Sequence, residues 1–116
     1  MDKGFSLIIL DINDFKSVND TYGHDYGDVV IKTVGTIIKK SFNKHYTCYR
    51  FGGDEFSIIG SETDQEKIEY QLRIMTNNLA QMREQGNPLP TVSYGYSIFR
   101  GGEKPDFQKN LKEVDN

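Results

Sequence analysis

Two adjacent glycines between two strand-like segments most constrain how this chain can fold. Residues 46–51 are rich in aromatic side chains, and residues 56–59 form a short apolar run that ends at Gly60. Gly52 and Gly53 lie between them, and adjacent glycines supply the positive φ angles that a two-residue hairpin turn needs. The segment therefore predicts a tight β-hairpin.

The exit of this turn also carries two neighbouring acids, Asp54 and Glu55, which a turn does not need. Neighbouring carboxylates repel each other, so such a pair lies in solvent or on a cation more often than in a core. The pattern alone leaves two interpretations open: a solvated turn, or a metal or acid–base site.

A second group of acids follows an apolar run at residues 5–10, which has the length and composition of a central strand buried on both faces. The run ends in three potential oxygen ligands, Asp11, Asn13 and Asp14. Capping of the next helix accounts for one of them, Asp14. Asp11 lies directly against the apolar run, where a carboxylate must be paired, hydrogen-bonded or metal-bound. A structural and a functional interpretation both stay open here.

The remaining segments predict helices and one more strand. Residues 21–28 contain two glycines and predict a turn, with His24 in the loop and Asp28 placed to cap the helix that follows. Residues 63–66 form a capping box that opens a longer helix. Residues 91–99 alternate as a half-buried strand, and residues 107–114 indicate a last helix. Helical spacing is seen at Val30, Val34, Ile37, Ile38 and Phe42, and again at Ile68, Leu72, Met75, Leu79 and Met82.

Length and charge limit the classes of protein. The 116 residues predict a single domain, residues 1–116, and the net charge of −3 comes with acids and bases mixed along the chain. Without a basic tract, binding to nucleic acid or to a membrane surface is not expected. No apolar run approaches a membrane span, and the only cysteine, Cys48, suits a reducing cytosol. We expect a cytoplasmic domain, whose parent protein can be membrane-anchored through other domains.

The order of elements predicts the fold class. Two helices that cross one face of a mainly antiparallel sheet make an α+β sandwich of the ferredoxin-like kind. In this topology the end of the first strand, at Asp11, can face the hairpin turn at Asp54. Convergent carboxylates are how proteins hold magnesium, so the topology predicts a divalent-metal site there.

Two motifs resemble the signatures of the GGDEF family, the diguanylate cyclases: RFGGDEF at 50–56 and LDINDFKSVNDTYGHDYGD at 10–28. SYGYS at 93–97 is similar to a third, weaker pattern of the family. The resemblance runs along the whole chain in order. It implies a nucleotide-cyclase fold, akin to adenylyl cyclases and polymerase palm domains, and the condensation of two GTP molecules into cyclic di-GMP plus pyrophosphate.

The resemblance also implies a role for each matching acid. Asp11 through its carboxylate and Ile12 through its backbone carbonyl would bind magnesium, for which manganese can substitute. Asp54 would complete the metal site and help to deprotonate the attacking 3′-hydroxyl. Glu55 would support the metal site or the nucleophile.

By the same resemblance, other residues would bind GTP. The two glycines of the turn would let the nucleotide lie across the hairpin, where a Cβ would clash. Asn19 and Asp28 would hydrogen-bond the guanine edge. Backbone amides of residues 13–16 would cradle phosphates at a helix start. The residues implied for substrate binding are Asn19, Asp28, His24, Lys16, Phe15, Gly52 and Gly53.

A dimer is expected from the chemistry that the resemblance implies. One domain binds one GTP, whereas cyclic di-GMP has two phosphodiester links, so two domains must face each other. We expect a homodimer for catalysis and a sensory domain elsewhere in the parent chain.

The sequence departs from the family pattern at several points. Asn13 stands where the family usually has a second aspartate, which removes a charge beside the metal site. Residues 43–46 replace the RxxD motif of product inhibition, so inhibition by cyclic di-GMP there is not expected. The segment that usually precedes the first strand and the lysine-bearing helix after residue 116 are missing. We therefore expect an incomplete domain that is weakly active or inactive as a fragment.

Two other functions stay open. One is a non-catalytic GGDEF domain that binds GTP as a regulatory input, against which the intact Asp54 and Glu55 speak. The other is a nucleotidyl cyclase or transferase of the same fold with a different substrate or product. The guanine-reading pair, Asn19 and Asp28, speaks against that change.

Overall fold

The computed structural model describes residues 4–42, 44–86 and 89–100. Within these ranges the strands form one antiparallel sheet in the order β2-β3-β1-β4. Along the chain the elements are β1 (Phe5–Ile12), α1 (Phe15–Tyr22), α2 (His24–Ser41), β2 (Tyr46–Phe51), β3 (Glu55–Gly60), α3 (Gln65–Glu84) and β4 (Val92–Phe99). Apart from the short α1, this is the βαββαβ arrangement. The predicted ferredoxin-like, palm-like α+β sandwich is confirmed.

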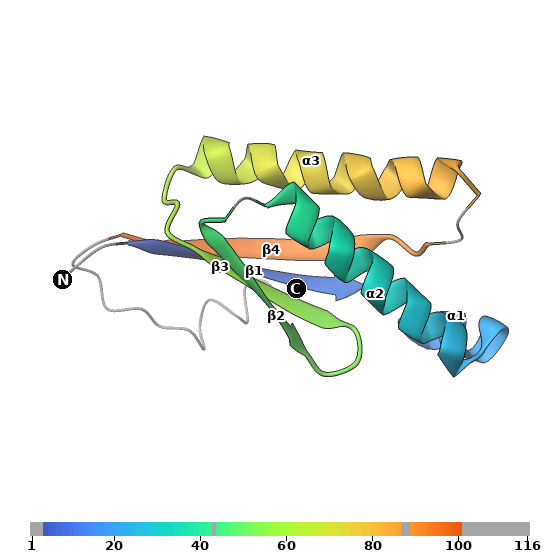
Figure 1. Cartoon of the computed structure of the whole chain (residues 1–116). Helices are drawn as coiled ribbons and strands as arrows, with labels where there is room; N and C mark the ends of the chain where they lie inside the picture. The colour runs from blue at the N-terminus through green and yellow to red at the C-terminus, as the bar shows by residue number, and fades with distance from the viewer. Residues whose placement is uncertain (1–3, 43, 87–88, 101–116) are drawn as a thin grey trace.

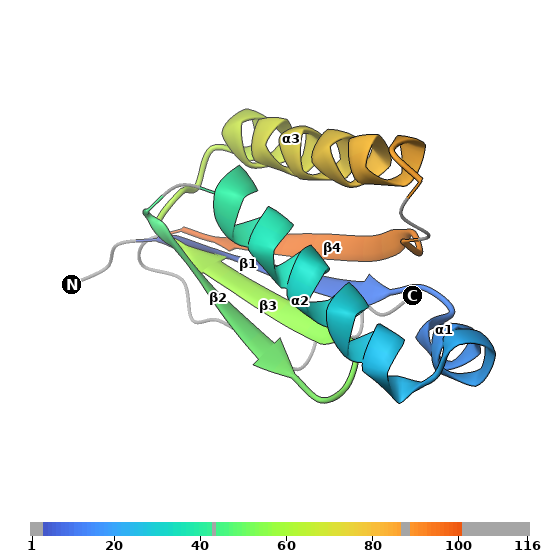
Figure 2. The same ribbon diagram turned by 45° about the vertical axis from the view of Figure 1, so that its right-hand side comes forward.

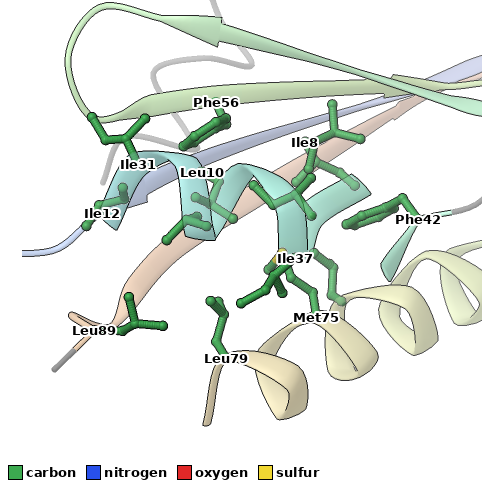
Figure 3. Packing of buried hydrophobic residues seen from close by; sticks show 14 of the residues in the cluster. Ile8, Leu10, Ile12, Ile31, Ile37, Phe42, Phe56, Met75, Leu79 and Leu89 are labelled. Atoms are coloured by element: carbon green, nitrogen blue, oxygen red, sulfur yellow. The ribbon is translucent and has the colours of Figure 1, made fainter. Parts of the chain in front are cut away.

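Helices α2 and α3 lie on the same face of the sheet, as both views show (Figures 1 and 2). The core fills the space between this face and the two helices (Figure 3). Strand β1 supplies Ile8, Leu10 and Ile12, each at most 2% exposed. The apolar run at residues 5–10 therefore forms a central strand, as predicted, between β3 and β4.

The helical stripes predicted from spacing are buried. In α2 these are Val30, Val34, Ile37 and Ile38, followed by Phe42 at the end of the helix. In α3 they are Ile68, Leu72, Met75 and Leu79, and Met82 packs partly buried against the same core. Burial of these side chains is what holds the helices on the sheet.

The register of the sheet divides its side chains between two faces. Ile8 pairs with Ile58 on one side and Tyr96 on the other, so these residues share the face that the helices cover. Asp11, an odd number of residues further along β1, belongs to the opposite face. Glu55 of β3 and Ser93 of β4 are its partners in the register on that face.

The prediction of a turn over residues 21–28 is wrong. Helix α1 runs to Tyr22 and α2 begins at His24, so only Gly23, with φ 91°, separates them. His24 is thus the first residue of a helix and not a loop residue. Asp28 lies inside α2 and does not cap it, because the N-cap position is Gly23. The second glycine, Gly27, has a packing role that is described below.

Two predicted caps also differ in the structure. The N-cap of α3 is Asp64 and not Thr63: an Asp64 Oδ1 atom accepts a hydrogen bond from the Glu66 amide at 3.0 Å. Glu62 Oε2 accepts from the amides of Thr63 and Asp64, at 3.2 Å each. Asp14 occupies the N-cap position of α1, but its side chain makes no capping hydrogen bond.

None of the helices in the described ranges combines the length and apolar content needed to cross a bilayer. The helix predicted at residues 107–114 lies outside the described residues.

Candidate active site

The acids singled out in the sequence meet at one end of the sheet, where β1 ends, β2 turns into β3 and α1 begins (Figures 1 and 2). Asp11 pairs directly with Glu55 in the ladder between β1 and β3. One residue further, the amide of Ile12 donates a hydrogen bond to the Asp54 carbonyl at 3.0 Å. The predicted convergence of the two segments is confirmed.

The three acids differ in how far their side chains are exposed to solvent. Asp11 and Asp54 are half-buried, whereas Glu55 is exposed. Like charges directly opposite each other in a sheet are unfavourable unless something compensates them. The donors are hard carboxylate oxygens, the kind that magnesium prefers over nitrogen or sulfur.

The site offers few side chains that could bind a metal ion. Across residues 4–42, 44–86 and 89–100, no group of three or more His, Cys, Asp or Glu side chains is arranged to hold a metal ion. Magnesium suits such a site, because it is bound through one or two carboxylates together with substrate phosphates and water. Asp11 and Asp54 offer carboxylate oxygens, the kind of ligand that magnesium takes from proteins.

The hairpin turn differs from the predicted two-residue turn. Phe51 pairs with Glu55, which leaves Gly52, Gly53 and Asp54 as a three-residue loop. Only Gly52 has a positive φ, 63°. The Arg50 Nη2 atom donates a hydrogen bond to the Gly53 carbonyl at 3.2 Å, which fastens the loop to the end of β2.

Nothing in the described part of the chain requires a glycine at position 53. Its φ is not positive, and a Cβ added to it would meet no atom within 4 Å. Gly52 has the same open space but the left-handed φ that favours glycine. The space above Gly53 is therefore open.

The connection from β1 to α1 is anchored on β4. The amide of Asn13 donates to the Thr91 carbonyl at 2.8 Å. The next residue, Asp14, is left-handed, with φ 54° and ψ 32°, and its carbonyl accepts from the Val18 amide at 3.2 Å. Phe15 and Lys16 open α1, whose first amides have no partner inside the helix. These amides lie directly after the acidic end of β1.

Gly27 explains how α1 and α2 pack together. It is buried within α2, and a Cβ there would overlap Oδ1 of Asn19 and lie 3.0 Å from its Cγ. Phe15 Cζ would be 3.2 Å from the same Cβ. The half-buried Asn19 side chain therefore occupies the space that Gly27 leaves. Asp28 follows Gly27 and is exposed.

His24 is exposed at the start of α2, and Lys16 is exposed in α1. The structure thus places every candidate residue either at the acidic end of the sheet or on the α1–α2 pair beside it. Sequence reasoning missed Thr91 and Ser93, which contact Asn13, and it took Gly27 for a turn residue. Only the alternation of β4 hinted at Ser93, by placing it on one face of a strand.

One cavity between α2 and the hairpin strands lies apart from the candidate acids. This cavity of about 490 Å³ is lined by Ile31, Lys32, Gly35, Thr36, Lys39, Cys48, Arg50 and Phe56. Asp11, Asp54 and Glu55 are not among its lining residues. The candidate site lies at the end of the sheet beside the hairpin turn, where Gly52, Gly53 and Glu55 are exposed.

The chain matches known proteins both in sequence and in structure. The family model "Diguanylate cyclase, GGDEF domain" matches residues 1–116. The chain is similar to diguanylate cyclase DgcZ of Escherichia coli, at 42% identity over 94 residues, which cover 78% of this chain and 32% of that protein. It is also similar to the uncharacterized protein YtrP of Bacillus subtilis, at 32% identity, covering 94% of this chain and 18% of that protein.

Two solved structures share the fold. The active GGEEF domain of a Vibrio cholerae diguanylate cyclase matches with a TM-score of 0.81 and 29% identity, covering 97% of this chain and 72% of that one. The GGDEF domain of DgcB from Caulobacter crescentus, in complex with c-di-GMP, matches with a TM-score of 0.78 and 28% identity, covering 97% and 68%. The chain spans a third or less of the length of the two curated relatives.

Proposed function

The chain belongs to the GGDEF family of diguanylate cyclase domains, and from this premise we propose that its parent protein condenses two GTP molecules into cyclic di-GMP and pyrophosphate. The observation that carries the proposal is the meeting of Asp11 and Glu55 in register, beside the Asp54 turn. The related DgcB domain was solved with c-di-GMP, which supports this dinucleotide as the product here.

Magnesium would be held by the carboxylates of Asp11 and Asp54 and by the backbone carbonyl of Ile12, with manganese as a substitute. When bound, it would neutralise the negative charge that builds up as a 3′-hydroxyl attacks an α-phosphate and pyrophosphate leaves. The hydrogen bond from Ile12 to the Asp54 carbonyl supports this assignment, because it ties the two segments that carry the ligands.

The chain's own acids would handle the proton of the attacking hydroxyl. Asp54, half-buried in the turn, would accept hydrogen bonding from the 3′-hydroxyl and help to remove its proton. Glu55, exposed at the first residue of β3, would orient the nucleophile or the metal site. Both residues lie where a nucleotide on the bare surface of Gly53 would come within reach.

Substrate binding would use the elements next to this edge. The free amides that open α1, with the charge of Lys16, would receive the phosphates. Asn19 and Asp28 would read the guanine edge from neighbouring positions on α1 and α2. Phe15 and His24 would line the same nucleotide pocket.

Catalysis would require two domains. The product contains two phosphodiester links, and each domain would present one GTP as nucleophile to the other. The exposed hairpin turn at the end of the sheet is consistent with a partner domain that closes the site. We place this domain in the cytoplasm, where GTP is available, under the control of a sensory domain in the parent chain.

The test is turnover by the full-length protein with Asp54→Asn, which removes one charge at nearly constant shape. Chromatography of a magnesium–GTP reaction should show at least a hundredfold slower formation of cyclic di-GMP, the usual size for the loss of a charged catalytic group. Glu66→Gln makes the same exchange in the first turn of α3, which follows the other end of β3, and should leave turnover unchanged.

Turnover by Asp54→Asn at the wild-type rate would overturn the assignment of the site. A wild-type protein that binds GTP but forms no cyclic di-GMP would instead identify a regulatory GTP-binding domain. A product other than cyclic di-GMP would point to a cyclase of different specificity.

A further inference from the structure

The side chain of Asn13 joins the end of β1 to the start of β4. Its Nδ2 donates to Oγ1 of Thr91 at 2.9 Å, and its Oδ1 accepts from Oγ of Ser93 at 2.8 Å. With the backbone bond to the Thr91 carbonyl at 2.8 Å, three hydrogen bonds hold this one residue. We refer to the three residues Asn13, Thr91 and Ser93 as the Asn13 clamp.

We propose that Asn13 is a positioning residue for GTP binding: the clamp fixes the turn that carries the phosphate-binding amides. This inference rests on the proposed function, which assigns those amides to GTP. The clamp is a long-range link, because its partners are 78 and 80 positions away in the sequence. Local turn geometry therefore does not supply it.

The backbone next to the clamp is in a conformation that needs support. Asp14 has φ 54° and ψ 32°, a left-handed conformation that is uncommon outside glycine, although aspartate adopts it more often than most other residues. Such a conformation persists where the surroundings hold it on both sides. On the helix side the Val18 amide bonds the Asp14 carbonyl, and on the strand side the clamp holds Asn13.

The turn is also anchored just before the clamp, because the Ile12 amide is bound to the Asp54 carbonyl. The chain from Ile12 to Phe15 is thus hydrogen-bonded to the hairpin turn at Asp54, to Thr91 and Ser93 at the start of β4, and to Val18 in α1. These hydrogen bonds set the position of the first amides of α1. Loss of the clamp would let Asp14 relax and would move the amides away from the phosphates.

The clamp works without a charge. An asparagine amide offers a donor and an acceptor, whereas an ionised aspartate only accepts. The hydroxyls of Thr91 and Ser93 can each donate, so Asn13→Asp can keep both side-chain bonds once the Thr91 hydroxyl reverses its role. Asn13→Ala loses both. Comparison of the two variants therefore shows whether the hydrogen bonds of the clamp matter, independently of whether residue 13 is an amide or a carboxylate.

The experiment compares Asn13→Ala, Asn13→Asp and Asn78→Ala in the full-length protein by steady-state kinetics with GTP. We expect Asn13→Ala to raise KM for GTP about tenfold, the effect of losing two neutral hydrogen bonds. The KM of Asn13→Asp for GTP should stay within about threefold of the wild-type value, because the aspartate side chain can still form both hydrogen bonds. If Asn13→Ala unfolds, Ser93→Ala removes one bond and should raise KM about threefold.

Asn78→Ala is the matched control. Asn78 Nδ2 donates to Oγ of Ser41 at 3.0 Å and so joins α3 to the last residue of α2, away from the acids. Its loss should lower the thermal midpoint without changing KM. A purely structural role for Asn13 would give the same result as this control.

The proposal on Asn13 is overturned if folded Asn13→Ala keeps KM and kcat within twofold of the wild type, or if Asn13→Asp is as impaired as Asn13→Ala. If the wild type binds GTP without turnover, the proposed function fails. The role of Asn13 is then tested by calorimetry, in which the Kd for GTP should change by the same factors that we expect for KM. If the wild type does not bind GTP, both proposals fail.

Discussion

The backbone amide of Ile12 donates a hydrogen bond to the carbonyl of Asp54 across 3.0 Å. The ladder between β1 and β3 ends one residue earlier, with Asp11 opposite Glu55. The bond therefore extends the pairing into the hairpin turn and sets Asp54 beside the end of β1. Two acidic segments that are distant in sequence are held together by the backbone, independently of any ligand.

The two glycines of the turn should respond differently to alanine. Gly53→Ala fills open space at a φ that is not positive, so we expect the free energy of unfolding to change by less than about 0.5 kcal/mol. A ligand that lies over the turn would meet the new Cβ, and KM for GTP should rise at least about tenfold, or ~1.4 kcal/mol. Urea denaturation and GTP kinetics measure the two effects.

Gly52→Ala is the control for this experiment, because Gly52 has equal open space but φ 63°. Because alanine is strained in the left-handed conformation, Gly52→Ala should lower the free energy of unfolding by about 1 kcal/mol. An unchanged KM for Gly53→Ala would show that GTP does not lie over the turn.

Gly27→Ala should disturb recognition more than folding. The new Cβ would overlap the amide end of Asn19, and a side-chain end can move aside at low cost. We therefore expect a change in unfolding free energy below about 1 kcal/mol. KM for GTP should rise about tenfold, because Asn19 would be displaced from the position in which we propose that it binds guanine. Discrimination between GTP and ITP, which lacks the exocyclic amine, should fall as well.

Gly35→Ala makes the same change in the same helix without the overlap. Its Cβ would lie 3.5 Å from Phe56 Cε1, an ordinary contact. Alanine favours a helix over glycine by up to about 1 kcal/mol, so this variant should be at least as stable as the wild type and equally active. If both variants bind GTP like the wild type, Asn19 does not act through the space left by Gly27.

Stability should depend on pH through Glu69. The Tyr96 hydroxyl donates to Glu69 Oε2 at 2.6 Å and Gln65 Nε2 donates to the same atom at 3.3 Å, and these bonds, that from Tyr96 first, lower the pKa of Glu69 below its ordinary 4.5. A carboxyl with a lowered folded pKa contributes stability that is complete above its unfolded pKa and lost as pH falls through the folded pKa. Tyr96→Phe should therefore destabilise the protein more at pH 7 than at about pH 3.

Denaturant titrations at the two pH values measure this difference. Tyr94→Phe serves as the control, since Tyr94 lies on the same face of β4 and is exposed. An equal loss for Tyr96→Phe at both pH values would show that the charge of Glu69 is not what the hydroxyl stabilises.

The elements themselves follow from local patterns. The apolar run at residues 5–10 identified a central strand because only a strand paired on both sides buries such a run. The spacing of Ile68, Leu72, Met75 and Leu79 identified the buried stripe of α3. Their order along the chain then predicted the meeting of Asp11 with the Asp54 turn, since the topology leaves few ways to arrange two crossing helices on one sheet.

The errors fall where glycine and cap residues have more than one use. Gly27 and Gly23 look alike in sequence, yet Gly23 breaks the helix and Gly27 lets α1 and α2 approach. Asp64 caps α3 where Thr63 was expected, a shift of one residue that helix patterns do not resolve.

The sequence by itself determined the fold class, the buried stripes and the segments that bring the acids together, because these depend on periodicity and element order. Only the tertiary structure decided how the turn between β1 and α1 is held. The Asn13 clamp joins residues 78 and 80 positions apart. Its partners, Thr91 just before β4 and Ser93 in β4, reach Asn13 only once β4 has paired with β1. The same holds for Asn19 against Gly27, a contact set by the packing of two helices rather than by any local pattern.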